Sequence, residues 1–226
     1  MPEDKIIYAF IDSQNLNLGT RKNIYKNRKL IYQGWQLDFK RFRQYLSDKF
    51  KVKKAYLFVD YLKQYENLYK SLRSFGYQLI FKPTVKDNHD KPKGNVDAEL
   101  VLHSAAIEFK NYHKAIIISG DGDFFCLHQY LAKNKKLLKI IIPNKYSESS
   151  LLKKFQSYKL FLYREKTKLE FKPKKREASL IDTKSKGRVL PDDYSHFIKL
   201  IKPCQQIHYY HCYNNLCPNR IINSQS

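Results

Sequence analysis

Five apolar runs along the chain have the length and the residue types of buried strands. They cover residues 6–11, 55–59, 77–81, 115–118 and 137–142. The runs are nearly continuous, whereas a strand with one face in water alternates apolar and polar residues. They therefore predict strands that are covered on both faces, as in a mainly parallel sheet.

Helical periodicity fills the stretches between these runs. The predicted helices cover residues 38–50, 64–74, 96–109, 123–133 and 149–157. In the second of them Leu68, Leu72 and Phe75 recur at helical spacing, and Gly76 follows as a stop signal. This alternation of strands and helices predicts an α/β sandwich.

The pattern divides the chain into one domain and a short basic C-terminal extension. Residues 83–95 hold two prolines, a glycine and several bases, so they predict a loop before the third helix. Lys and Arg dominate residues 164–188, which indicates a linker. We therefore expect a domain over residues 1–163 and an extension over residues 164–226, with a short helix at residues 192–201.

Length and composition favour a soluble globular protein. The 226 residues suffice for one substantial α/β domain, and 42% of them are hydrophobic and 28% charged. No apolar run approaches the roughly 20 residues that span a bilayer. The first ten residues carry two acids where a signal peptide has bases. We therefore expect a cytoplasmic protein with no membrane partner.

The net charge points to a polyanionic partner. The chain has 43 Lys and Arg against 21 Asp and Glu, a formal net charge of +22. Such an excess attracts RNA, DNA or an anionic membrane surface, and charge alone does not choose among them. A Lys-rich surface that only reflects biased genomic composition is the alternative.

Acidic residues nevertheless follow two of the predicted strands. Asp12 and Asn15 come after the first strand, and Asp121 and Asp123 follow the fourth within SGDGDF. The binding crevice of an open α/β sheet lies at the carboxyl ends of its strands, so these acids are expected at one edge. Each has a structural alternative, because Asp123 suits a helix N-cap and Asp12 an Asx-turn.

A divalent cation would explain why acids cluster in so basic a chain. Neighbouring carboxylates repel each other and raise each other's pKa. Mg²⁺ and Mn²⁺ prefer oxygen ligands, combine one or two carboxylates with waters and phosphate, and assist phosphoryl transfer. The two motifs together predict a site for Mg²⁺ or Mn²⁺.

Three motifs, in order, resemble those of the NYN domain, the branch of the PIN-like nuclease superfamily that includes the LabA-like proteins. They are FIDSQNL at residues 10–16, KGNVDAELVL at residues 93–102 and SGDGDF at residues 119–124. FGYQLIFKP at residues 75–83 and SESSLLKKF at residues 147–155 also look like pieces of the family. The resemblance covers about residues 5–163.

The resemblance implies a Rossmann-like, three-layer PIN/NYN sandwich that hydrolyses RNA with a divalent ion at its carboxyl edge. Carried over by position, the catalytic and metal-binding acids are Asp12, Asp97, Asp121 and Asp123. The residues with orienting or substrate-binding roles are Asn15, Lys93 and Ser119. A solvated loop lysine explains Lys93 nearly as well.

One position departs from the family pattern. Members often carry a further acid six residues after the position of Asp97, where this chain has His103. His103 suits a softer metal ligand, a general acid near neutral pH or, as we favour, a helix residue packed on its neighbours. Glu99 could substitute, although two residues along a helix point in different directions. Asp60 also follows a strand, but it has no counterpart in the family pattern.

Cysteine is concentrated near the end of the chain. Three of the four cysteines lie after residue 200, so no disulfide framework is expected across the fold. The sulfur and imidazole groups that could hold zinc there are Cys204, His208, His211, Cys212 and Cys217. Their spacing is not a standard finger pattern, so a small packed or frayed tail is the favoured interpretation.

These observations lead to a metal-dependent endoribonuclease as the first hypothesis. Its expected partner is single-stranded or looped RNA, because aromatic residues lie among bases and a flexible strand can enter a narrow acidic pit. An RNA-binding adaptor that keeps the NYN fold without turnover is the alternative, which His103 favours and the intact acidic motifs disfavour. A phosphatase or nucleotide hydrolase is a third class, which the charge disfavours.

Overall fold

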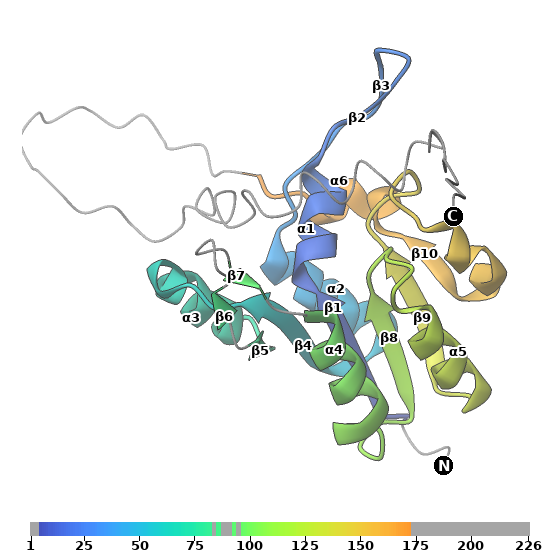
Figure 1. Cartoon of the computed structure of the whole chain (residues 1–226). Coiled ribbons are helices and arrows are strands. Elements are labelled where there is room, and N and C mark those ends of the chain that lie inside the picture. Colours follow the sequence, from blue (N-terminus) through green and yellow to red (C-terminus); the bar gives the residue numbers. More distant parts are fainter. Residues whose placement is uncertain (1–4, 83–84, 87–91, 94–95, 173–226) are drawn as a thin grey trace, which may run out of the picture.

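A six-stranded parallel sheet forms the centre of the structure (Figure 1). The computed structural model describes residues 5–82, 85–86, 92–93 and 96–172. The strand order is β10-β9-β8-β1-β4-β5, and each neighbouring pair is parallel. The strands are β1 (Ile7–Asp12), β4 (Val52–Asp60), β5 (Tyr77–Lys82), β8 (Lys114–Ile118), β9 (Leu137–Ile142) and β10 (Lys159–Phe161). The five predicted strands are confirmed, and β10 adds an edge strand that the pattern did not predict.

Helices cover both faces of this sheet, which confirms the three-layer α/β sandwich. One face is covered by α1 (Ser13–Arg21), α2 (Phe39–Phe50), α3 (Glu66–Ser74) and α6 (Lys166–Leu169). The other face is covered by α4 (Val96–Leu102), the π-helical turn η2 (His103–Ile107), α5 (Phe125–Lys133) and the 3₁₀ helix η3 (Ser150–Tyr158). The five helices predicted between the strands are present, α1 and α6 were not predicted, and the short helix expected at residues 192–201 lies outside the described residues.

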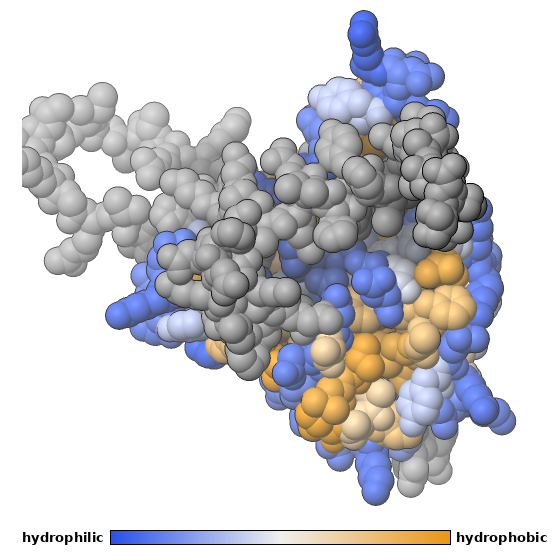
Figure 2. All heavy atoms as spheres, in the orientation of Figure 1, coloured by the Kyte–Doolittle hydropathy of each residue, from blue (hydrophilic) through white to orange (hydrophobic). Residues whose placement is uncertain are grey.

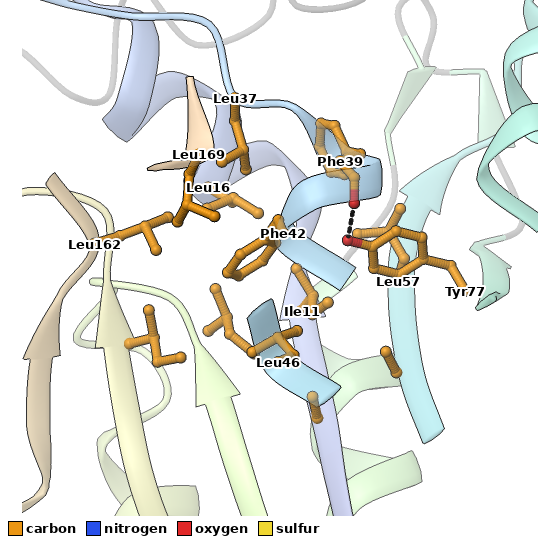
Figure 3. Close-up of a cluster of buried hydrophobic side chains, with 14 of the residues drawn as sticks. Ile11, Leu16, Leu37, Phe39, Phe42, Leu46, Leu57, Tyr77, Leu162 and Leu169 are labelled. Carbon is orange, nitrogen blue, oxygen red and sulfur yellow. Dashed lines mark hydrogen bonds between the residues drawn. The ribbon is translucent and has the colours of Figure 1, made fainter. Parts of the chain in front are cut away.

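Side chains of β1 alternate between the two cores, as a strand with two covered faces requires. Ile11 packs in one buried cluster, whereas Phe10 packs in the other. Figure 3 shows the first cluster, in which Phe42 and Leu46 of α2 lie over Ile11. The continuous apolar runs of the sequence follow from this double burial.

Short elements complete the connections of the fold. They are β2 (Ile24–Lys26), β3 (Lys29–Tyr32), η1 (Lys63–Tyr65), β6 (Val85–Lys86), β7 (Pro92–Lys93) and η4 (Leu162–Glu165). β6 and β7 pair as a small antiparallel hairpin within the predicted loop of residues 83–95. No helix in the described part of the chain is long and apolar enough to cross a membrane.

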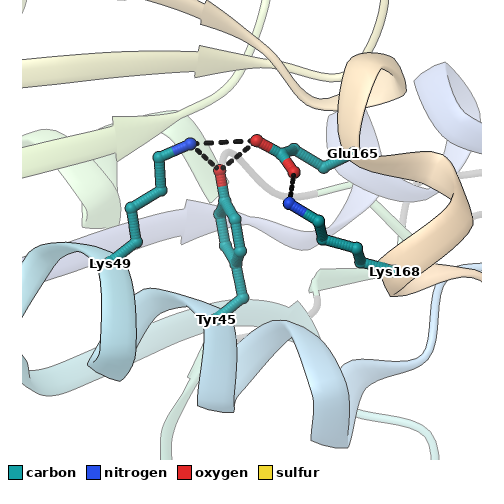
Figure 4. A network of polar contacts seen from close by, with 4 residues as sticks. All are labelled: Tyr45, Lys49, Glu165 and Lys168. Carbon is teal, nitrogen blue, oxygen red and sulfur yellow. Dashed lines mark hydrogen bonds and ion pairs between the residues drawn. The ribbon is translucent and has the colours of Figure 1, made fainter.

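Residues just after residue 163, which the sequence analysis assigned to the basic extension, contact the domain. Leu169 is buried, and its carbonyl accepts a hydrogen bond from the backbone N–H of Asp38 at 2.8 Å. Glu165 ties the same segment to α2, because its carboxylate accepts from Lys49 Nζ at 2.9 Å and contacts Tyr45 (Figure 4). The basic composition therefore concealed a segment that packs on the domain as far as about residue 172.

A buried histidine makes the fold sensitive to acid. His128 of α5 is fully buried, and neither ring nitrogen has a hydrogen-bond partner among the described residues. Burial lowers the pKa of His128 from 6.5 to about 4, because the charged imidazolium is poorly solvated there.

Replacing His128 by Leu should therefore reduce acid denaturation. Below pH 6.5 His128 is protonated in the unfolded chain but stays neutral in the folded protein. The free energy of unfolding therefore decreases as the pH falls toward 4. At pH 5 this loss amounts to about 2 kcal/mol. Urea unfolding at pH 7 and pH 5 should show the advantage of His128→Leu growing by about that amount. A constant difference between the two proteins would contradict the burial argument.

Candidate active site

The carboxyl ends of two neighbouring strands bring the candidate residues together. β1 and β8 are adjacent and parallel, with Ile11 paired to Ile118. The next residues, Asp12 and Ser119, therefore lie side by side at the edge of the sheet. Both are buried, with 5% of Asp12 and 0% of Ser119 exposed. The sequence motifs of residues 10–16 and 119–124 thus meet in space.

Asp12 is held by hydrogen bonds from both motifs. Its Oδ1 accepts the backbone N–H of Asn15 at 3.0 Å, which makes Asp12 the N-cap of α1. Its Oδ2 accepts the hydroxyl of Ser119 at 3.2 Å. Capping and a site role are nevertheless compatible, since each carboxylate oxygen accepts one hydrogen bond here and retains a second lone pair.

Ser119 and Asn15 connect Asp12 to the loop of Asp121. Ser119 Oγ accepts the backbone N–H of Asp121 at 3.1 Å, so one hydroxyl touches both acidic residues. Asn15 Oδ1 accepts the backbone N–H of Gly120 at 2.8 Å. Two of the three predicted orienting residues, Asn15 and Ser119, thus connect the ends of β1 and β8 through hydrogen bonds.

Asp121 shapes the turn that follows β8. Its Oδ1 accepts the backbone N–H of Asp123 at 3.1 Å. A Cβ at Gly122 would lie 2.4 Å from Ser149 Oγ and 3.1 Å from Leu151 Cδ1, so a larger residue would require the Ser149 side chain to move. Asp123 itself is exposed and does not cap α5, whose N-cap position is Phe124.

The surroundings of Asp12 are electrostatically unfavourable for its negative charge. The pKa of Asp12 is raised from 3.8 to about 7, first by burial and then by the charges of Asp97 and Asp121. The hydrogen bonds from Asn15 and Ser119 lower it, but not enough to compensate. A buried acid in this state is suited to binding a cation or exchanging a proton near neutral pH.

Three of the four predicted acids lie near one another, and one is peripheral. Asp97, from α4, and Asp121 are close enough to Asp12 for their charges to interact. Asp123 lies at the exposed rim. Among the described residues, no group of three or more His, Cys, Asp or Glu side chains is placed to hold a metal ion.

The donor set suits a hydrated divalent ion. Carboxylate, hydroxyl and amide oxygens are hard ligands, and Mg²⁺ usually keeps several waters and takes only one or two carboxylates. Asp12 and Asp121, linked through Ser119, provide such a pair. Asp97 can add a third charge from α4.

The remaining acidic candidates and His103 occupy other positions. His103 lies against the rings of Tyr56 and Phe58, with ring centroids 6.2 and 5.5 Å away, and its Nε2 is 3.8 Å from Glu99. His103 and Glu99 therefore interact with each other on the α4–η2 helix. Asp60 lies two residues beyond the β4 partner of Asp12, and its charge acts on Tyr69 of α3.

Two further sets of predicted site residues, Lys93 and the suggested zinc ligands, lie partly or wholly outside the described residues. Lys93 pairs with Val85 through its backbone, and its side chain lies outside the described residues. All of the suggested zinc ligands lie outside them as well: Cys204, His208, His211, Cys212 and Cys217.

Asn144 is a positioning residue that the sequence reasoning missed. It is 1% exposed, its Nδ2 donates to the Gly19 carbonyl at the end of α1, and its Oδ1 accepts from the backbone of Tyr146 and Ser147. The loop that it shapes reaches the site, because the N–H of Ser149 donates to the Gly120 carbonyl at 3.0 Å. The sequence feature that could have identified Asn144 is its position as a polar residue just after a third strand, β9.

Comparisons with known proteins agree with this geometry. A family model described as the NYN domain matches residues 7–161. The crystal structure of a protein of unknown function from Vibrio parahaemolyticus is similar at a TM-score of 0.57 and 19% identity, covering 72% of this chain and 95% of that chain. At that identity the likeness supports the fold alone. A search of curated proteins found no match.

Proposed function

Because the chain belongs to the NYN domain family, within the PIN-like nuclease superfamily, we propose that it is a metal-dependent endoribonuclease. The observation that carries this proposal is the buried Asp12 carboxylate, whose pKa is raised to about 7 beside Asp97 and Asp121. A protein with a net charge of +22 brings these three acids together at the edge of its sheet. A divalent ion and an anionic substrate together account for both features.

Each residue of the site has a role in this proposal. Asp12 and Asp121 hold Mg²⁺ or Mn²⁺, Asp97 adds charge from α4, and Asp123 contributes at the rim. When bound, such an ion lowers the pKa of water and neutralises the charge that builds on the phosphodiester. Ser119 and Asn15 hold the two acidic loops at a constant separation, and the surrounding bases attract the RNA backbone.

Cleavage of single-stranded RNA tests this proposal directly. Labelled RNA incubated with Mn²⁺ should be cut, and EDTA should stop the reaction. Asp121→Asn should slow cleavage at least about ten-fold, because it removes one negative charge from the site. Equal cleavage under all three conditions would exclude the mechanism and indicate a contaminating nuclease.

Binding without cleavage would favour the second candidate, an RNA-binding adaptor with the NYN fold. His103 stands where many family members carry a further acid, and it packs on Tyr56 and Phe58. The linked Asp12, Ser119 and Asp121 weigh against this candidate, because a binding surface alone does not require a buried, raised-pKa acid.

A further inference from the structure

A small antiparallel hairpin projects from the edge of the sheet at which β1 and β8 end. It consists of β2 and β3, covers residues 24–32, and follows α1 directly (Figure 1). We call it the basic hairpin. The segment from residue 13 to residue 37 contains five Lys or Arg and no Asp or Glu. In Figure 2 the hairpin is hydrophilic, whereas apolar surface gathers over α4 and α5.

The base of the basic hairpin is fixed to the end of α1. The backbone carbonyl of Thr20 accepts two hydrogen bonds, from the Tyr32 hydroxyl at 3.0 Å and from the backbone N–H of Trp35 at 2.9 Å. The Gly34 N–H donates to Asn23 Oδ1 at 2.8 Å. A Cβ at Gly34 would lie 1.8 Å from the Arg21 carbonyl, so the chain passes where no other residue fits. The N-cap of α1 is Asp12, so this base connects the hairpin to the site.

The tip of the basic hairpin, in contrast, packs against nothing in the described domain. Every residue from 25 to 30 is exposed, including Tyr25 at 60% and Leu30 at 43%. A hairpin tip that buries no apolar surface gains little stability from the domain. We therefore expect the exposed tip to contact a partner molecule.

The sequence of the tip is unfavourable for the hairpin taken alone. Lys26 pairs directly with Lys29, and like charges opposite each other destabilise a ladder. Asn27 and Arg28 occupy the turn with φ of 50° and 61°, where Gly is preferred at the second position. A polyanion would relieve the repulsion among Lys26, Arg28 and Lys29.

We propose that the basic hairpin binds the single-stranded RNA that flanks the cleavage site. The choice of RNA rests on the function proposed above. Lys26, Arg28 and Lys29 contact phosphates, and Tyr25, which stands opposite Leu30, stacks on a base.

The dimensions agree with a flanking contact. With about 1.5 Å per residue for α1 and about 3.3 Å per residue for the hairpin, the tip reaches up to about 25 Å from Asp12. Short RNAs would therefore fill the site without reaching the tip.

Binding in EDTA tests the hairpin without any dependence on hydrolysis. Fluorescence anisotropy of a labelled RNA of about 20 nucleotides is measured over a range of salt concentrations, with full-length protein. The variant combines Lys26→Gln, Arg28→Gly and Lys29→Gln. Because Asn-Gly is a favoured two-residue turn, Arg28→Gly removes charge and preserves the hairpin.

A matched control removes three charges from the other edge of the sheet. Lys53→Gln, Lys110→Gln and Lys133→Gln lie near the amino ends of strands or in the turns before them, and all three lysines are exposed. Tyr25→Ala is measured separately, since it removes the stacking ring and leaves the charge unchanged.

The hairpin variant should bind about 100-fold more weakly near 0.1 M salt, and the slope of log K against log salt should fall by about 2. Tyr25→Ala should weaken binding about ten-fold with little change in slope. Unchanged binding by the hairpin variant, or an equal loss in the control, would overturn the proposal. A loss confined to the hairpin variants supports it, even if no RNA is cleaved with Mn²⁺. Binding through the hairpin without cleavage in Mn²⁺ would exclude the proposed ribonuclease activity and leave the proposed hairpin contact intact.

Discussion

Asp12→Asn should lower RNA cleavage by at least about 1000-fold and yet make the protein more stable in EDTA. The folded pKa of Asp12 is about 7 against 3.8 for a free carboxyl, so the folded state favours the protonated acid. Stability contributed by this proton is full below pH 3.8 and is lost as the pH rises to 7. The substituted amide has no such proton to lose, so at pH 8 the advantage of the variant should reach up to about 4 kcal/mol.

The substitution preserves the local structure, which makes the comparison clean. Asn is as good an N-cap as Asp, so Oδ1 can still accept the N–H of Asn15. Ser119 can serve as acceptor or donor toward the new amide. Unfolding by urea at pH 5, 6, 7 and 8 should show the advantage growing with pH. Destabilisation at pH 8 would contradict the raised pKa.

Added Mn²⁺ provides a second readout that does not depend on cleavage. An ion that binds ionised Asp12 stabilises the folded wild type, and more strongly at pH 8 than at pH 6. Asp12→Asn should lose most of this rise in melting temperature. Asp48→Asn is the control, since Asp48 lies exposed on α2 and accepts a hydrogen bond from Gln44. Equal stabilisation of all three proteins would place the ion elsewhere.

Asn15→Ala should slow cleavage about 100-fold with only a small loss of stability. The substitution keeps the backbone N–H that bonds to Asp12, but it removes the Oδ1 that accepts from Gly120. The loop of Asp121 is then free to shift, and a displacement of about 1 Å is enough for such a loss in rate. The lost hydrogen bond should reduce the free energy of unfolding by about 1 kcal/mol.

Asn15→Asp distinguishes positioning from a direct chemical role. Its carboxylate can still accept the Gly120 N–H, so the loops stay connected, but it adds a negative charge beside Asp12. That charge raises the pKa of Asp12 further, so the pH at which activity is half-maximal should move upward. Asn67→Ala, at an exposed position of α3, is the matched control. A pH profile identical to that of the wild type would contradict the proposed proximity.

Several elements of the fold could be predicted because the burial of their residues is visible in the local sequence pattern. The five apolar runs became β1, β4, β5, β8 and β9, since a strand buried on both faces carries hydrophobic residues throughout. The acids after β1 and β8 could be placed at one edge for a topological reason. Parallel neighbours end at the same side of a sheet, so residues far apart in sequence meet there.

Other elements were missed because their local signals are weak or misleading. α1 has the sequence SQNLNLGTR, poor in strong helix formers, and it depends on capping by Asp12 and on the burial of Leu16. The basic hairpin turns at Asn27-Arg28, which lacks the Gly of a recognisable turn. The segment around α6 looks like a charged linker, because only Leu162 and Leu169 are fully buried in it.

By itself the sequence determined the α/β class, the parallel sheet and the pair of acidic strand ends, because burial and strand direction are written in local residue patterns. Only the tertiary structure decided how those acids differ. Asp12 is buried, caps α1 and accepts a serine hydroxyl, Asp97 comes from a helix on one face of the sheet, and Asp123 is exposed to solvent. The physical reason is that a pKa depends on burial and on charges brought near by the fold, which no local pattern records.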